Sequence, residues 1–103
     1  MTCVVSFIRA KTGGAGAASV GSVRKKEVVT VPGSTTITAE AGEIALVGNG
    51  ETTMVLVAWG STPDAVATSE TSATTAGMPV AAGWTSPPLV MNAGDKVNIK
   101  AVA

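Results

Sequence analysis

Seven carboxylates and one thiol are the most chemically versatile groups in this sequence of 103 residues. Two carboxylates close together can act as general acid and base, and several can hold a calcium ion, which takes about six to eight oxygen ligands. The acids are scattered along the chain, but Glu40 and Glu43 flank a single turn and could share an ion. We favour the more ordinary interpretation, in which both are solvated turn residues.

Histidine is absent from the sequence, and its absence removes most routes to catalysis. Nucleophilic mechanisms of the Ser-His-Asp or Cys-His kind need a base whose pKa lies near neutral. Zinc sites need several Cys and His ligands, whereas this chain has one cysteine. The glycine-rich stretch 13–19 resembles a dinucleotide-binding loop, but Ser19 stands at the third glycine position and no βαβ unit follows. We therefore expect a protein that is not an enzyme and uses no metal and no cofactor.

Cys3 and one basic run could contact a partner. A single cysteine is a buried small hydrophobe, an inert surface thiol or half of a bridge between chains, and we expect one of the first two. Arg24, Lys25 and Lys26 form the only basic run, which would guard an edge strand or lie in a solvated loop, with docking on an acidic protein surface as the alternative. The net charge is zero, so we expect no nucleic-acid partner, since such binding needs several phosphates to be neutralised.

Two tryptophans, Trp59 and Trp84, are the remaining side chains that could bind a ligand. An exposed indole could stack on a sugar ring in a small carbohydrate-binding module. The sequence beside each ring offers few of the Asn, Asp or Tyr groups that sugar sites use. We therefore expect both rings to fill the core or to anchor a subunit interface, where Trp is enriched.

The elements that must position these residues are short strands. Strand patterns recur about every ten residues, separated by Gly, Pro, Asn, Asp or Ser, and no segment keeps helical spacing for three turns. The sequence predicts an all-β fold, either a small antiparallel β-sandwich or a jelly-roll-like barrel of about seven or eight short strands. The expected strands are 2–10, 23–31, 35–39, 44–48, 51–59, 78–81, 89–91 and 96–102.

Three turn motifs connect these strands. Asn49-Gly50 lies between two apolar strands and predicts a type I′ hairpin, because this dipeptide accepts two positive φ angles. The stretches 40–43 and 92–95 each place an Ala-Gly-acid sequence before a strand. We expect these two stretches to be the same turn used twice.

The N-terminal region is expected to differ from the rest of the domain. Residues 11–22 are rich in Gly, Ala and Ser and favour a flexible connection. We therefore expect residues 1–22 to form an N-terminal strand with a flexible Gly/Ala arm, and residues 23–103 to form a single β-sandwich domain. The strand 2–9 would add to the sheet edge of a neighbouring subunit, held by main-chain hydrogen bonds.

Composition limits where the protein works. With 46% hydrophobic residues and no net charge, the chain should fold. Its longest apolar run, Met54–Trp59, is much shorter than the roughly 18 residues of a membrane span, so we expect no membrane partner. The first ten residues lack the long apolar stretch of a signal peptide, which favours synthesis in the cytoplasm. A chain of this size buries only about 60–65% of its unfolded surface, which favours oligomerisation or docking on a larger surface.

Three stretches in the C-terminal half carry a resemblance to a known family. They are VAWGSTPDA at 57–65 with the Ala/Ser/Thr-rich loop after it, GMPVAAG at 77–83, and AGDKVNIK at 93–100. Together they resemble small capsid decoration or cement proteins, the head accessory proteins of tailed bacteriophages. The resemblance implies a β-sandwich that binds the capsid surface, commonly as trimers or dimers, with no catalytic or ligand-binding residues.

We therefore expect a structural virion protein, made in the host cytoplasm, that binds the major capsid protein or other virion subunits through hydrophobic and strand-addition contacts. A neck, collar or fibre-base protein and a carbohydrate-binding or adhesive β-module are the alternatives. The side chains expected to bind the partner are Cys3, Val5, Phe7, Arg24, Lys25, Lys26, Trp59 and Trp84.

Overall fold

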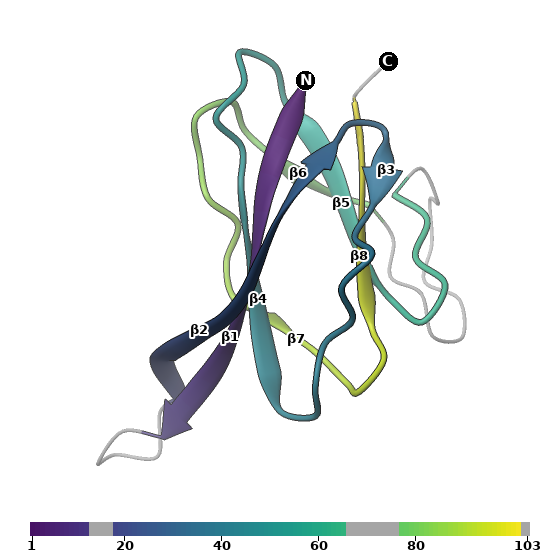
Figure 1. Ribbon diagram of the computed structural model, residues 1–103. Coiled ribbons are helices and arrows are strands. Elements are labelled where there is room, and N and C mark those ends of the chain that lie inside the picture. Colours follow the sequence, from purple (N-terminus) through teal and green to yellow (C-terminus); the bar gives the residue numbers. More distant parts are fainter. Residues whose placement is uncertain (13–17, 66–76, 102–103) are drawn as a thin grey trace.

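Two antiparallel four-stranded sheets pack face to face (Figure 1), which confirms the expected all-β sandwich. The structure is a computed structural model and describes residues 1–12, 18–65 and 77–101. The loop expected between 66 and 76 and the glycines between 13 and 17 lie outside the described residues. The strands are β1 (Thr2–Thr12), β2 (Ala18–Thr30), β3 (Gly33–Ser34), β4 (Glu43–Gly48), β5 (Val55–Gly60), β6 (Met78–Val80), β7 (Leu89–Val90) and β8 (Lys96–Ala101).

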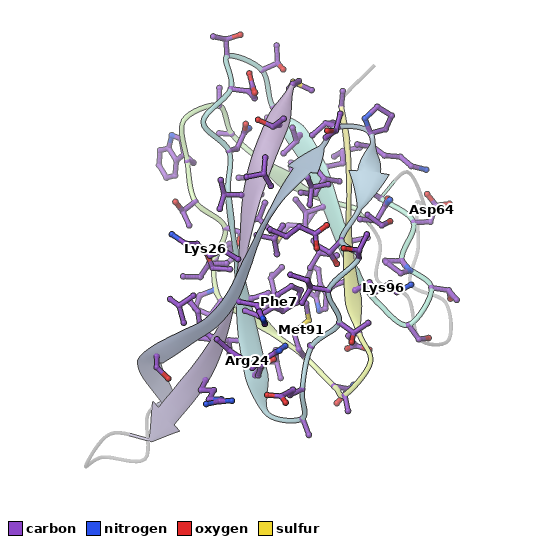
Figure 2. The ribbon with its side chains drawn as sticks, viewed as in Figure 1. Phe7, Arg24, Lys26, Asp64, Met91 and Lys96 are labelled. Carbon is purple, nitrogen blue, oxygen red and sulfur yellow. The ribbon has the colours of Figure 1, made fainter. Side chains whose placement is uncertain are left out.

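The core lies between the sheets β2-β1-β4-β7 and β3-β8-β5-β6. Side chains alternate along each strand, so every second residue points inward. With few aromatic residues available, most inward positions hold Val or Ala, and Phe7 and Met91 are the largest fully buried apolar side chains (Figure 2). The side chains that fill the core from β1, β4, β5 and β8 include Cys3, Val5, Phe7, Ala45, Val47, Val55, Val57, Val97 and Ile99.

The N-terminal strand β1 is an internal strand of its sheet, so the expectation that it reaches a neighbouring subunit is wrong. It pairs with β2 on one edge and with β4 on the other, from Val4↔Gly48 to Arg9↔Glu43. Both rows of main-chain groups are therefore used within the chain. The strand is apolar on both faces, and pairing with two strands of its own chain buries its inner side chains without a second subunit.

The Gly/Ala-rich stretch is strand at both of its described ends. β1 continues to Thr12 and β2 begins at Ala18, and these two residues pair with each other. Residues 11–12 and 18–22, expected to be flexible, thus form a two-stranded ribbon that extends past the last β1–β4 pair (Figure 1). Cross-strand pairing outweighs the weak strand propensity of Gly and Ala, because propensity in sheets depends mainly on the neighbours.

Asn49-Gly50 connects the two sheets and does not form a hairpin, so this prediction is wrong. The strands on either side, β4 and β5, belong to different sheets. Asn49 is buried, and its side-chain Nδ2 donates to the carbonyl oxygens of Thr53, Val80 and Ala81 at 2.9, 3.1 and 3.3 Å. The asparagine side chain therefore bonds distant loops, where a hairpin turn would leave it at the surface.

The segment 35–39, expected to be a strand, runs between the sheets without regular pairing. The Thr35 and Ala39 amides donate to Val97 O and Asp95 O at 2.9 and 2.8 Å, and the Thr35 hydroxyl accepts from the Val97 amide at 3.1 Å. On its other side, Glu27 of β2 accepts 2.9 Å hydrogen bonds from the amides of Thr36 and Ile37. The segment thus closes one open side of the sandwich with isolated bonds to both sheets.

The two Ala-Gly-acid turns have the same geometry, as expected from their sequences. Gly42 and Gly94 adopt φ angles of 77° and 87°, which suits the third position of a type II turn. In each turn the last residue donates its amide to the first carbonyl, at 3.2 Å for Glu43 and 3.1 Å for Asp95. Its carboxylate accepts from the amide of the first residue, at 2.7 and 2.9 Å respectively.

We predict that Asn49→Ala lowers the free energy of unfolding by about 1–3 kcal/mol, because the buried carbonyl of Val80 and the partly buried carbonyl of Ala81 would lose a donor. Chemical denaturation followed by tryptophan fluorescence measures this change. The matched control is Asn92→Ala, an identical substitution at an exposed turn position, which should change stability by less than about 0.5 kcal/mol. Equal effects of the two substitutions would contradict this role of Asn49.

Candidate functional site

An ion pair between Arg24 and Glu43 links the edge of one sheet to its third strand. The pairs Phe7↔Lys25 and Ile8↔Val23 leave Arg24 as an extra residue in a β-bulge, which re-aims its side chain. Arg24 Nε and Nη2 donate to Glu43 Oε2 and Oε1 at 2.6 and 2.9 Å, and Nη2 also donates to Thr38 O at 2.9 Å. The Glu43 side chain is only 2% exposed, so the expectation of a solvated turn residue is wrong for Glu43.

Both carboxylates that could have shared a metal ion share the Arg24 guanidinium instead. Arg24 Nε lies 2.6 Å from Glu43 and 3.1 Å from Glu40, which is exposed. The hydrogen bond from Arg24 lowers the pKa of Glu43; burial opposes this effect, and the Glu40 amide adds to it. The bond to Glu43 likewise raises the pKa of Arg24. A carboxylate held ionised in this way supports the fold and is a poor general acid.

Within residues 1–12, 18–65 and 77–101, no three His, Cys, Asp or Glu side chains lie close enough together to hold a metal ion. A search of the same residues for a helix long and apolar enough to cross a membrane finds none.

Three of the expected partner-binding residues lie in the protein's own core. Cys3, Val5 and Phe7 are at most 1% exposed and face the opposite sheet, so they cannot contact a partner. The Cys3 thiol lies 4.0 Å from Asn49 Oδ1, and burial, followed by the charge of Glu51, raises its pKa. The three side chains share one face of β1, and that face is internal because it packs against the opposite sheet.

The other expected residues divide between the ion pair, the strand edge and the surface. Arg24 forms an ion pair with Glu43, so its charge is not available to bind a partner. Lys25 and Lys26 are exposed on β2, which is an edge strand. Their position matches the expected guarding of an edge. Trp59 is half-buried and packs against the core, while Trp84 is 69% exposed.

The outer face of the β2-β1-β4-β7 sheet carries an apolar row that no sequence motif marked. Directly paired residues in an antiparallel sheet point to the same face. The pairs Ile8↔Val23, Ile8↔Ile44 and Ile44↔Val90 therefore align four apolar side chains across all four strands. Val23 and Val90 at the two ends are 51% and 75% exposed, while Ile8 and Ile44 between them are buried, at 2% and 7% exposed.

Two further rows complete this outer face. Ser6 pairs with Lys26 and with Leu46, and Val4 pairs with Val28 and Gly48. Val28 is 63% exposed and Val4 is 40% exposed. Among the paired residues of these three rows Lys26 carries the only charge, so the face combines exposed valines with a single cation. The sequence of β1 indicates that its outer face carries the apolar residues Val4 and Ile8. Only the strand pairing shows which residues of β2 and β4 lie beside them on that face.

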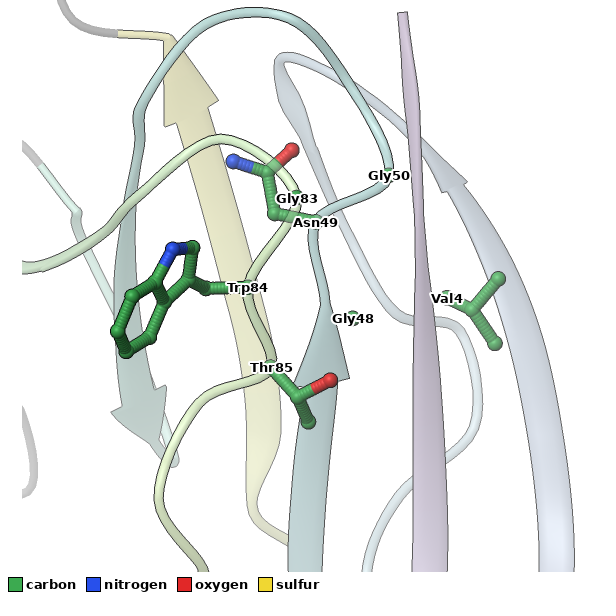
Figure 3. A pocket seen from close by; sticks show the side chains of 7 residues that line it. All are labelled: Val4, Gly48, Asn49, Gly50, Gly83, Trp84 and Thr85. Carbon is green, nitrogen blue, oxygen red and sulfur yellow. The ribbon is translucent and has the colours of Figure 1, made fainter.

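A second surface feature surrounds Trp84 (Figure 3). A hollow of about 290 Å³ is lined by Val4, Gly48, Asn49, Gly50, Gly83, Trp84 and Thr85. A neighbouring hollow of about 220 Å³ is lined by residues 79–81 and 84–87. Trp84 therefore lines both hollows, and in Figure 3 its indole and the Thr85 side chain point to opposite sides of the loop that carries them.

Comparison of the whole chain with models of protein families, with curated proteins and with solved structures finds no match.

We predict that the domain loses stability in acid as Glu43 is protonated. The pKa of Glu43 is lowered on folding, so its contribution is fully present above the unfolded value of about 4.3 and is lost as pH falls through the lower folded value. Denaturation midpoints measured between about pH 6 and 2.5 should fall less steeply in Glu43→Gln, which has no carboxylate at this position, than in the wild type. An unchanged pH slope in this variant would contradict the role of the ion pair.

We predict that the Cys3 thiol is protected in the folded protein. The thiolate is the reactive form, and burial both raises the pKa of Cys3 and blocks access to it. Labelling by a soluble aromatic disulfide at pH 8 should be at least about 100-fold slower in the native protein than in denaturant, because reaction needs the domain to open. Comparable labelling rates in the two states would show that Cys3 is accessible.

Proposed function

We propose that this protein is a structural virion component that decorates or cements a bacteriophage capsid, and that it docks through the outer face of the β2-β1-β4-β7 sheet. The observation that carries the proposal is the apolar row from Val23 to Val90, whose two end valines are exposed. Its partner would be the major capsid protein or another virion subunit. The C-terminal motifs that resemble head accessory proteins provide the reason for choosing a capsid over other large surfaces.

The exposure of the outer face supports docking. Val23, Val28 and Val90 are each more than half exposed, and they lie on one side of one sheet. Burying such side chains against a partner would contribute on the order of 1 kcal/mol each, so repeated contacts on a lattice add up. Apolar groups clustered on one face of a small domain commonly mark an interaction site.

Because β1 pairs on both edges within its own chain, copies of the protein would not associate by strand addition of their N-termini. Residues 2–9 cannot add to a neighbour, because both edges of β1 are occupied. The strands at the ends of this sheet are β2 and β7, and Lys25 and Lys26 on β2 oppose edge pairing. A dimer or trimer on the capsid would therefore use side-chain contacts in place of strand addition by the N-terminus.

The direct test uses particles of the source phage assembled without this protein, to which purified protein is added back. We predict that the double variant Val23→Asp and Val90→Asp weakens binding at least about tenfold, because each carboxylate would lose its water of hydration in the interface. Bound copies are counted by gel densitometry after sedimentation. Because both positions are exposed, the fold should be retained.

The control is Met54→Asp, which places one such negative charge at an exposed apolar position outside the three rows of the outer face. It should bind as the wild type does. Wild-type binding by the double variant would overturn the docking face. Binding only to necks or tail fibres, with none to capsid shells, would instead support the neck, collar or fibre-base alternative.

A further inference from the structure

Trp84 is the one aromatic side chain among the described residues that is mostly exposed. Phe7 is fully buried and Trp59 packs partly against the core, whereas Trp84 is 69% exposed. An indole is a large apolar surface with a polar N–H at its edge. Its exposure calls for an explanation, since the other two aromatic side chains, Phe7 and Trp59, both pack in or against the core.

The backbone that carries this ring is fixed on both sides. The Trp84 amide donates to Ala81 O at 3.1 Å, and the Trp84 carbonyl accepts from the Asn49 amide at 2.8 Å. Thr85 forms a β-bridge with Gly48, and the Ser86 amide donates to Val47 O at 2.8 Å. The ring therefore stands on a preorganised support, which reduces the entropy lost when a ligand is bound.

The hollow beside the ring has a distinct chemical character. It holds about 290 Å³, at the small end of ligand sites, which suits one ring of a ligand and not a long chain. None of its seven lining residues is charged, and three of them are glycines that leave main-chain groups uncovered. A side-chain carbon added at Gly50 or Gly83 would meet nothing within 4 Å, so this side of the hollow is open to a ligand.

Two polar groups at the hollow have no hydrogen bond within the described residues. They are the Trp84 indole N–H and the hydroxyl of Thr85, which is exposed. The Asn49 amide, in contrast, is fully used in holding the loops together. Because the indole and the Thr85 side chain point to opposite sides of the loop (Figure 3), a ligand on the ring would meet one flat surface and one N–H donor, with no ionic partner.

We propose that Trp84 binds a single neutral pyranose ring, such as a terminal sugar of a glycan. The C–H groups on one face of a pyranose carry partial positive charge and pack on the negative face of an aromatic ring. A sugar hydroxyl that reaches the edge of the indole would accept a hydrogen bond from its N–H. The uncharged lining favours a neutral sugar over a phosphorylated or acidic one, and the single ring favours a sugar over an extended peptide.

The indole lies apart from the proposed docking row, although Val4 and Gly48, which line the hollow beside it, belong to the same outer face. Ile8 and Val4 both point outward from β1, and four residues of strand place Val4 about 13 Å from the row that contains Ile8. The inference does not depend on the virion proposal. A protein that failed to bind shells could still bind sugars, and the reverse also holds.

The test is a titration of ¹⁵N-labelled protein with methyl β-glucoside, methyl β-galactoside and methyl N-acetyl-β-glucosaminide, followed by amide chemical shifts. We expect saturable shifts at Gly50, Gly83 and Thr85 with at least one glycoside, at a Kd of millimolar order. Trp84→Ala should weaken this binding at least tenfold, and Trp84→Phe should retain part of it. Val90→Asp, which lies in the docking row, should bind the glycoside as the wild type does.

Three outcomes would overturn the proposal. The first is the absence of saturable shifts with all three glycosides, and the second is binding that persists unchanged in Trp84→Ala. The third is a loss of shell binding in Trp84→Ala without any glycoside response in the wild type, which would assign the ring to a protein interface. Because the substituted ring is exposed, a folded variant is expected, and its amide spectrum verifies this directly.

Discussion

Packing of two sheets across a core of small side chains is the constraint on which the rest of this structure depends. With few aromatic residues to fill the interior, both sheets must present Val, Ala and Ile inward at every second position. The strand that satisfies this demand most fully is β1, which supplies Val5 and Phe7 and pairs on both edges. The same alternation places Val4 and Ile8 of β1 on the outer face of the sheet, opposite Val5 and Phe7.

The polar groups that are buried serve mainly to join loops to sheets. The Asn49 side chain, between the two sheets, donates hydrogen bonds to the carbonyls of Val80 and Ala81, at the start of the loop that carries Trp84. The Glu43 carboxylate accepts hydrogen bonds from the Arg24 guanidinium and from the Glu40 amide of its own turn. Each is fully bonded, as buried polar groups must be if they are not to cost stability. Among the described side chains that are not exposed, no buried nitrogen or oxygen lacks a partner. These bonds fix the surfaces on either side of the sheet sandwich.

The fold class was predictable from the sequence, because strand periodicity and turn residues are local signals. The paired Ala-Gly-acid turns at Gly42 and Gly94 followed from the same chemistry and were confirmed. The Asn49-Gly50 hairpin and the addition of residues 2–9 to a neighbouring subunit were wrong, since both depended on which strands pair, and that is decided by the whole chain. The β-bulge at Arg24 could not be predicted either, because neither the composition nor the residue spacing indicates it.

The candidate site was predictable only in part. Trp84 and the β2 lysines were chosen from residue type alone, and the structure places them at the surface. The outer apolar row needed the register, because its members come from four strands far apart in the chain. Likewise, Thr85 gained its place beside the indole hollow through the bridge to Gly48.

The proposal that this protein docks by one sheet face makes a definite statement about orientation on the particle. A cryo-electron microscopy map of phage particles assembled with this protein measures that orientation directly. The account predicts density for the domain on the outer surface of the shell, with the β2-β1-β4-β7 sheet facing the capsid and Val90 within the contact. Density with the β3-β8-β5-β6 sheet facing the capsid, or no density on the shell at all, would contradict it.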